Sequence, residues 1–457
     1  MGCGTSSGRS GVFAVTQDGV DQPSTAVSLQ NRATDEVAAK HRADIEKDVE
    51  LASLAELERA RNKGEGAAQP ATAPVAIGWD RCDGDQVEDL VGSGAVAVLD
   101  AAWLVSFAAS GGILARRQLL PAEAFLDVST LKSSLSPTST TLHLIVLSYA
   151  WLTPKHPDPR GTTLRLLAKV LSAFIELWGG RKVGVFWDFG SLHQHPDVNA
   201  GLLRTPSEQE LFTRALSGLG TLYAHRSTWV LRVTTFPKGY PEEYEDELPA
   251  NSNTATYAER GWTFVETSWA CMAKGRGFSD AGPSQVWDLG KLDTTESSWY
   301  EMRDKCTKDK VRPPPLTPDK FETSLSSKRF TNEKDDRPLV VKLYTERYRS
   351  VLQPVRFLQY AGLEWGDEEA ARVAEVLTSG ALPNLEYLDL SGNDISDEGA
   401  KTLAIALATG SAPRLTQLHL SGNPRLSKGG DRACRATLQE KMKALQVYTQ
   451  WRRDPKT

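Results

Sequence analysis

The chain has 457 residues, a hydrophobic fraction of 40% and a formal net charge of −5. This length exceeds what one ordinary core holds, so two or three domains are expected, and the acidic balance offers no basic surface for nucleic acid. Five cysteines are scattered without a CxxC pair, so the sequence signals neither a zinc ribbon nor a disulfide framework. The N-terminus lacks the apolar region of a secretory signal, and a cytoplasmic setting is the simpler expectation.

Residues 1–30 are predicted to be a disordered segment that carries a lipid anchor. The opening MGCGTSS fits the pattern for N-myristoylation, with Gly2 as the acceptor. One myristoyl chain holds a membrane only marginally, and Cys3 is placed to add a palmitoyl chain. The alternative is a flexible glycine- and serine-rich terminus that matches by chance. The pattern favours attachment to the cytoplasmic face of a membrane.

Residues 31–75 are predicted to form a charged helix followed by a linker. Ala, Glu, Lys, Arg and Leu dominate its first half, and the apolar stripe is thin and drifts, which is typical of a solvated helix. A coiled-coil dimer would need sustained heptads, which the segment lacks.

Residues 95–115 are the one stretch that resembles a membrane span. They carry Asp100, whose carboxylate would be costly inside a bilayer, and Gly111 and Gly112 interrupt the stretch near its end. We therefore predict a buried helix with a glycine stop.

Residues 76–305 are predicted to form an α/β domain, because apolar, β-rich runs alternate with segments that carry leucines at helical spacing. The predicted strands are 140–151, 182–188 and 227–236, and the predicted helices are 162–178, 205–220 and 259–274. This alternation predicts a doubly wound, mainly parallel sheet. Ligands of such sheets bind at the carboxyl ends of the strands.

Polar and aromatic residues gather at those predicted strand ends and at the start of the helix that follows the third strand. They are Ser148, Tyr149, Trp151, Trp187, Asp188, Arg260, Trp262 and Glu266. Since a purely structural sheet does not need such residues clustered at one edge, they are candidates for lining a pocket.

Three motif segments carry these residues: LSYAW (147–151), VFWDFGSLHQ (185–194) and ERGWTFVE (259–266). In this order and spacing they resemble the hallmark elements of the heterokaryon-incompatibility (HET) domain. The resemblance covers roughly residues 140–275 and adds Gln194 to the candidate pocket residues.

The motif segments also depart from the HET pattern. Leu152 stands in place of a glycine, Leu192-His193 in place of Cys-Ile, and Val265 in place of a glutamine. The chain more closely resembles a group of protist and algal proteins with LSYxWLxPxHPDP, FWDxxSLxQ and RGW elements.

HET domains are similar to Toll/interleukin-1-receptor (TIR) domains, which have a flavodoxin-like fold. Some TIR domains cleave NAD at the nicotinamide bond with a glutamate, whereas others only assemble with partners. The resemblance therefore implies either NAD as a substrate, with Glu266 catalytic, or an assembly role. No GxGxxG or GKS/T loop supports a nucleotide site, and no cofactor is otherwise indicated.

Glu266 and Asp188 each have two interpretations. A glutamate can stabilise an oxocarbenium-like centre, as in glycosidic cleavage, and Ser148, Asp188 and Arg260 would then shape its pocket. Alternatively, an Arg260–Glu266 or a Glu266–Ser148 link holds the motif together structurally. Asp188 either binds substrate or caps the turn after its strand. The sequence leaves these alternatives open.

A metal site is a further hypothesis for the second motif segment. His193 and His195, with Asp188 and Asp197 nearby, have ligand chemistry. However, His195 precedes a proline in a predicted loop, and the spacing matches no hydrolase pattern. This favours solvated loop histidines and no metal site.

Residues 351–457 are predicted to form a short solenoid, because the chain repeats itself at a spacing of 30 residues. The shift places Leu385, Leu388, Leu390 and Asn393 on Leu415, Leu418, Leu420 and Asn423. The pattern L-x-x-L-x-L-x-x-N resembles leucine-rich repeats of the long, ribonuclease-inhibitor-like kind, with one strand and one helix per unit. The leucines should point inward and the asparagines should satisfy backbone groups at the turns. Leu363 replaces the asparagine of the first unit, which we interpret as a capping repeat.

So short a solenoid needs support, since about three units is the minimum for stability. A helix over residues 431–451 is the expected support, and residues 306–350 are predicted to be a linker and a connecting helix. Such arcs usually bind protein, but one this short could equally be scaffold.

Together these features predict a lipid-anchored signalling or assembly protein that faces the cytoplasm, binds a protein partner through its repeats and self-associates. The first alternative is a TIR-type hydrolase that cleaves NAD with Glu266. The second is a non-catalytic interaction scaffold whose motif segments only hold its fold.

Overall fold

The computed structural model describes residues 81–449, apart from residues 130, 132–141, 180, 198–199, 251, 275–284, 294 and 309–311. All described residues belong to one compact unit, Val75–Thr457. The predictions for residues 1–30 and 31–75, including the lipid acceptors Gly2 and Cys3, lie outside the described residues.

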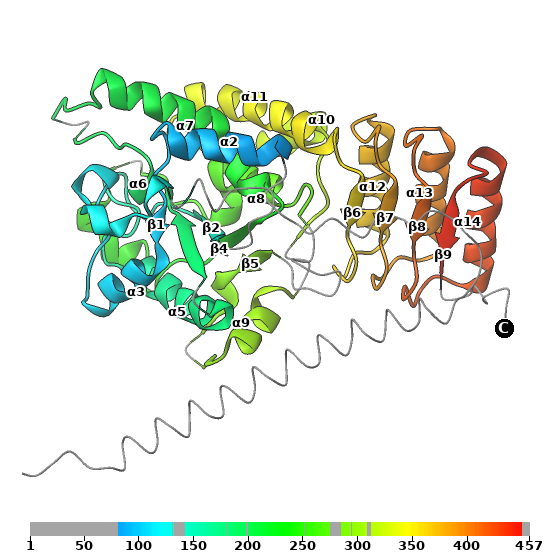
Figure 1. The fold of residues 1–457 in the computed structure, drawn as a ribbon, viewed down its shortest axis with the longest axis horizontal. Helices are drawn as coiled ribbons and strands as arrows, with labels where there is room; N and C mark the ends of the chain where they lie inside the picture. The colour runs from blue at the N-terminus through cyan, green and yellow to red at the C-terminus, as the bar shows by residue number, and fades with distance from the viewer. Residues whose placement is uncertain are drawn as a thin grey trace, which may run out of the picture. The chain divides into compact units, whose positions relative to one another are not determined.

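The N-terminal part of this unit is built on a five-stranded sheet (Figure 1). Its strands are β1 (Leu99–Asp100), β2 (Leu142–Tyr149), β3 (Lys182–Phe186), β4 (Thr228–Val233) and β5 (Val286–Asp288). Their spatial order is β1-β3-β2-β4-β5, with β1 antiparallel to β3 and every other pair parallel. The prediction of a mainly parallel α/β sheet is therefore confirmed.

Helices cover both faces of this sheet. One face packs against α3 (Ala101–Ala109), α5 (Thr162–Trp178) and α9 (Trp299–Cys306). The other packs against α2 (Arg81–Gly92), α7 (Pro206–Ala224), α8 (Gly261–Ala270), α10 (Pro318–Leu325) and α11 (Glu333–Leu352). The remaining short turns are α6 (Asp188–Ser191), η1 (Arg117–Leu119), η2 (Ala122–Ala124), η3 (Glu242–Glu247), η4 (Tyr257–Glu259) and η5 (Leu289–Lys291). Side chains alternate along β2, so Leu144 and Val146 enter one core and Ile145 and Leu147 the other.

Local sequence signals explain where several helices begin and end. Thr205 accepts a hydrogen bond from the backbone of Glu208, and the Glu208 side chain accepts one from the backbone of Thr205, which forms a capping box at the start of α7. α7 was predicted to end at Gly220, but it continues to Ala224 because its last turn is buried in the core. Gly179, at φ 42°, ends α5 as predicted.

The apolar stretch 95–115 contains a shorter helix than predicted. β1 comes first, and the Asp100 carboxylate then accepts hydrogen bonds from the backbone N–H groups of Ala102 and Trp103, which makes it the N-cap of α3. The helix ends at Ala109, before Gly111 at φ 79°. Among the described residues, no helix is both long and apolar enough to cross a membrane.

The C-terminal part consists of repeated strand–helix units. A parallel sheet in the order β6-β7-β8-β9 is formed by Phe357–Gln359, Tyr387–Asp389, Gln417–His419 and Gln446–Tyr448. The helices α12 (Asp367–Thr378), α13 (Asp397–Ala408) and α14 (Lys428–Lys441) lie side by side (Figure 1). The prediction of a helix over 431–451 is therefore wrong for its C-terminal part. The helix α14 ends at Lys441, and the chain then forms the fourth strand, β9.

The two asparagines of the repeat hold the turns together, as predicted. Asn393 accepts hydrogen bonds from the backbone N–H groups of Leu363 and Trp365 and donates to the carbonyls of Tyr360 and Leu390. Asn423 occupies the equivalent position one unit later, where it likewise bonds to backbone on both sides. The first unit lacks its own asparagine and depends on the one that follows.

The first repeat rests directly on the sheet domain. The Tyr360 hydroxyl donates to the Met272 carbonyl at 2.5 Å, and the Trp365 indole N–H donates to the Arg312 carbonyl at 2.8 Å. The helices α10 and α11, which lie in the segment predicted to link the two domains, share one hydrophobic core with the repeats. The support that a short solenoid needs comes from this shared core.

Candidate functional site

The three motif segments meet at the carboxyl edge of the parallel strands. Ser148 and Tyr149 close β2, and because successive strand residues point to opposite faces, they belong to two clusters. Ser148 points to the side of α7 and α8, and Tyr149 joins the core on the opposite face. The expected single pocket is thus two neighbouring side-chain clusters.

The first cluster joins Ser148 to Glu266. The Ser148 hydroxyl donates to Glu266 Oε2 at 2.5 Å and shares a 2.7 Å hydrogen bond with the Tyr257 hydroxyl. Tyr257 in turn lies 2.9 Å from Thr267 Oγ1. This chain of hydroxyl groups connects β2, the turn before α8 and α8 itself. It matches the Glu266–Ser148 link that the sequence left open as a structural role.

The carboxyl group of Glu266 lies in a desolvated environment, although the residue is only half-buried as a whole. Burial raises the pKa of Glu266 well above its ordinary value, and the nearby charge of Asp188 raises it further. Hydrogen bonds from Ser148 and Tyr223 oppose this by favouring the ionised form. Perturbed carboxylates of this kind are frequent at catalytic sites, but structural networks produce them as well.

The second cluster surrounds Asp188, at the start of α6. Its carboxylate accepts hydrogen bonds from the Tyr149 hydroxyl at 2.6 Å, the Trp151 indole N–H at 3.0 Å and the backbone N–H of Phe189 at 2.6 Å. The Gln194 side chain donates to the Asp188 carbonyl at 3.1 Å. Burial raises the pKa of Asp188 despite these donors. Asp188 therefore bonds to the backbone at the start of α6 without being its N-cap, which is Trp187, and joins the first two motif segments.

Arg260 joins the first and third motif segments through backbone groups. Its guanidinium donates to the carbonyls of Trp151 at 2.6 Å, Asn253 at 2.6 Å and Ala255 at 2.8 Å. The side chain is buried, and burial lowers its pKa. The structure thus directs Arg260 to three carbonyls, and the expected Arg260–Glu266 link is not among its hydrogen bonds within the described chain.

Trp262 points toward a different part of the molecule. Its indole N–H donates to Asp336 on α11 at 3.1 Å, and its ring packs against the core that includes α11. Trp262 therefore ties α8 to α11 and lies apart from the Asp188 cluster.

The two loop histidines are only partly solvated, whereas the sequence favoured solvated loop histidines. His193 Nδ1 lies 3.4 Å from a Glu208 carboxylate oxygen, and His195 Nδ1 accepts a hydrogen bond from the Arg204 backbone. Both rings are half-buried, and burial lowers both pKa values. Within the described part of the chain, no three His, Cys, Asp or Glu side chains gather as metal ligands do.

Two tyrosines of the site were missed by the sequence prediction. Tyr257 lies in a short turn before Arg260, and Tyr223 lies in the last turn of α7, which was predicted to have ended. Tyr223 donates to the Leu147 carbonyl at 2.9 Å and faces Glu266. A prediction that extended α7 beyond Gly220 would have included Tyr223 in this helix.

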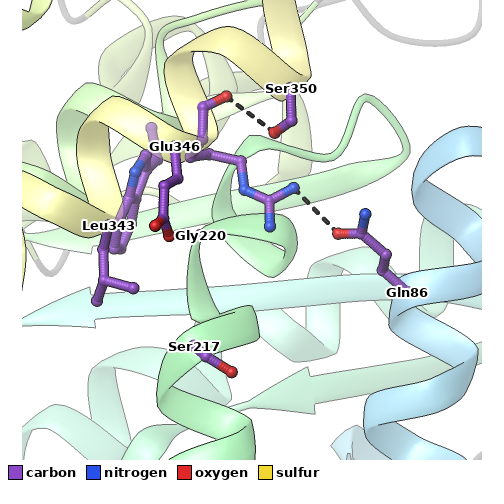
Figure 2. A pocket seen from close by; sticks show the side chains of 8 residues that line it. Gln86, Ser217, Gly220, Leu343, Glu346 and Ser350 are labelled. Carbon is purple, nitrogen blue, oxygen red and sulfur yellow. Dashed lines mark hydrogen bonds between the residues drawn. The ribbon is translucent and has the colours of Figure 1, made fainter.

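Two cavities lie away from the motif segments. One, of about 180 Å³, is lined by residues of α2, α7, α8 and α11 (Figure 2). The other, of about 640 Å³, lies between α10, the end of α11 and α12. None of the candidate pocket residues lines either cavity.

Comparison with known proteins bears on the C-terminal part alone. No curated protein matches the chain. The family model described as Leucine Rich repeat matches residues 381–404, which comprise β7 and most of α13. The predicted leucine-rich repeat is therefore confirmed for this part of the chain.

Proposed function

We propose that this protein is a signalling or assembly protein that binds a protein partner through the strand face of its repeats. The observation that carries the proposal is an aromatic band across all four strands, formed by Phe357, Tyr387, His419 and Tyr448. Neighbouring ring centroids are 6.2, 4.8 and 4.3 Å apart. Phe357 is 44% exposed and the other three rings are half-buried. Rigid aromatic side chains on a regular sheet are typical of protein interfaces.

The sheet domain supports the same proposal through its resemblance to HET and TIR domains. In chain order, its parallel strands are arranged 2-1-3-4, which agrees with the flavodoxin-like order expected of a TIR relative. Helices on both faces of the sheet support a doubly wound arrangement. Self-association of this domain, with a partner held on the repeats, would make the chain an assembly unit.

Site-specific crosslinking tests the partner surface. A photo-crosslinking residue in place of Tyr387 should capture one defined protein, and capture should be lost when His419→Ala and Tyr448→Ala are added, because the band is then broken. The matched control carries the same residue in place of Ile405, which is 55% exposed on α13. Equal capture from both positions, or capture that survives the two alanine substitutions, would refute the strand face as the binding surface.

Attachment to the cytoplasmic face of a membrane, through Gly2 and Cys3, is part of the proposed function. Gly2→Ala should release the protein into the soluble fraction, because it removes the myristoyl acceptor and one remaining chain anchors weakly. Cys3→Ser should give partial release. Unchanged membrane association of Gly2→Ala in a fractionation experiment would show that the N-terminal pattern matches by chance.

A second candidate function is hydrolysis of NAD by the sheet domain. It is favoured by the position of Glu266 and Asp188 in neighbouring clusters at the carboxyl edge of parallel strands, with the pKa of both carboxyl groups raised by burial. Glu266 would stabilise the oxocarbenium-like centre that forms when nicotinamide leaves. Incubation of the full chain with NAD, with nicotinamide release as the readout, tests this candidate.

A further inference from the structure

A series of aromatic rings leads from the core of the sheet domain to its surface. It lies on the face of the sheet that α5 and α9 cover. Its members, in order, are Trp178, Trp229, Trp287, Trp299 and Tyr300. Successive ring centroids lie 5.6, 6.0, 5.7 and 5.2 Å apart. Aromatic pairs in contact have centroids about 4.5–7 Å apart, so each ring of this series contacts the next.

The residue types in the ring series go beyond what packing requires. Tryptophan and tyrosine are the two aromatic side chains that readily lose an electron to a one-electron oxidant, whereas phenylalanine does not. Trp229 and Trp287 are 2% and 0% exposed, and Tyr300, at the end of the series, is 43% exposed. The ring series therefore connects buried, oxidisable rings to one that meets solvent.

The hydrogen bonding of the indole groups determines where a missing electron, or hole, comes to rest. A tryptophan that loses an electron becomes a radical cation, and the hole is trapped there once the indole N–H releases its proton. The indole N–H groups of Trp229 and Trp299 are buried and, within the described part of the chain, have no hydrogen-bond acceptor. Their radical cations keep the proton, so the hole remains free to move. The exposed Tyr300 can release its phenolic proton to water, which leaves a neutral radical and holds the hole there.

A cation lies beside the last step of the ring series. The Arg303 guanidinium lies 5.3 Å from the ring centroid of Trp299 and 5.3 Å from that of Tyr300. Its positive charge disfavours a radical cation on Trp299, but it has little effect on the neutral radical that Tyr300 forms. The charge therefore favours transfer of the hole from Trp299 to Tyr300.

We propose that the ring series carries oxidising equivalents out of the core of the sheet domain to Tyr300. A one-electron oxidant takes an electron from one of the tryptophans, electrons then pass from ring to ring toward that tryptophan, and Tyr300 gives up the last electron together with its phenolic proton. The net change is one electron gained by the oxidant, one proton gained by water and one O–H bond broken at Tyr300. A soluble thiol restores the tyrosine by donating a hydrogen atom, and it becomes a thiyl radical.

The ring series ends beside two residues whose sulfur atoms are readily oxidised. Met302 and Cys306 lie on α9, the helix that begins with Trp299 and Tyr300, and both are buried in the same core. Burial raises the pKa of the Cys306 thiol to about 12, so the thiol stays protonated. A hole that rests on Tyr300 is no longer available to oxidise either sulfur atom. This role requires neither partner binding by the repeats nor NAD cleavage.

Photo-oxidation of the full chain tests whether Tyr300 is the exit. Light that tryptophan absorbs and tyrosine does not creates the hole, and a cobalt(III) pentaammine complex takes up the electron irreversibly. Mass spectrometry of digested protein measures the products. Tyr300→Phe should increase oxidation of Trp299 and Met302 several-fold, because the hole can no longer leave the core. Tyr448→Phe is the matched control, since the Tyr448 ring stacks on His419 of the repeat sheet, and it should match the wild type. Unchanged oxidation of Trp299 and Met302 in Tyr300→Phe would overturn the proposal.

Interruption of the ring series supplies a second test, in which Tyr300 remains in place. Tyrosyl radicals on two molecules couple to a dityrosine crosslink, which the same digestion detects as a crosslinked Tyr300 peptide. Trp299→Phe keeps an aromatic ring but removes the oxidisable indole next to Tyr300, so this crosslink should be lost. Trp103→Phe, at a half-buried ring that stacks on Phe107, is the matched control and should crosslink as the wild type does. Equal crosslinking of Trp299→Phe and this control would show that Tyr300 is oxidised without the ring series, and the proposal would fail.

Discussion

Arg260→Lys is expected to lower the free energy of unfolding by about 3–5 kcal/mol, because one buried guanidinium donates to three backbone carbonyls. Those carbonyls belong to Trp151, Asn253 and Ala255, which lie in two different segments. A lysine ammonium keeps the charge but cannot reach three acceptors arranged around a planar fork. Two of the three carbonyls would lose their donor, and the attachment of the loop before α8 to the end of β2 would weaken.

Chemical denaturation of the full chain measures this loss, and Arg329→Lys is its matched control. The backbone of Arg329 forms an isolated β-bridge with the backbone of Arg260, but the Arg329 side chain is exposed. Replacement of Arg329 by lysine should therefore change the free energy of unfolding by less than about 0.5 kcal/mol. If Arg260→Lys is as stable as this control, the three carbonyl contacts contribute little, and a direct role of the guanidinium in binding a ligand becomes the better interpretation.

The parts of the fold that repeat or alternate could be predicted from the sequence. Buried parallel strands appear as apolar runs between glycine-terminated helices, and β2, β3 and β4 lie within the three predicted runs. The 30-residue shift of the leucine pattern returns as the register of the repeat sheet, in which Phe357, Tyr387 and Gln417 are paired. In both cases one face of an element must be buried, and that requirement is visible in the amino-acid order.

The contacts of the candidate site could be predicted only in part. The three motif segments were expected at one edge, and side-chain hydrogen bonds join them through Asp188, Glu266 and Arg260. The Glu266–Ser148 bond was among the alternatives that the sequence left open. The three carbonyl partners of Arg260 were not foreseen, because a backbone carbonyl has no sequence signature and any residue supplies one. Strand geometry alone predicts that Ser148 and Tyr149 point to opposite faces of the sheet. It does not predict which helices cover each face, and these helices supply the partners of the two side chains.

Glu266→Gln is expected to remove the pH dependence that burial of this carboxyl group imposes on stability. The pKa of Glu266 is raised by burial well above its ordinary value of 4.5, so the folded chain binds this proton more tightly than the unfolded chain. The wild type should therefore lose stability as pH rises above about 4.5 toward the folded value. Glutamine resembles the protonated form, so the variant should match the wild type near pH 4 and exceed it at pH 8.

The same substitution should abolish NAD cleavage, with a loss of at least about 100-fold if Glu266 stabilises the reacting centre. Only the ionised carboxylate can do so, so nicotinamide release by the wild type should increase with pH over the range in which its stability decreases. Glu259→Gln is the matched control, because Glu259 is exposed and only caps the turn at Thr256. A variant that gains stability at pH 8 while the wild type shows no NAD cleavage at any pH would leave Glu266 with a purely structural role, in which its bond to Ser148 joins α8 to the sheet.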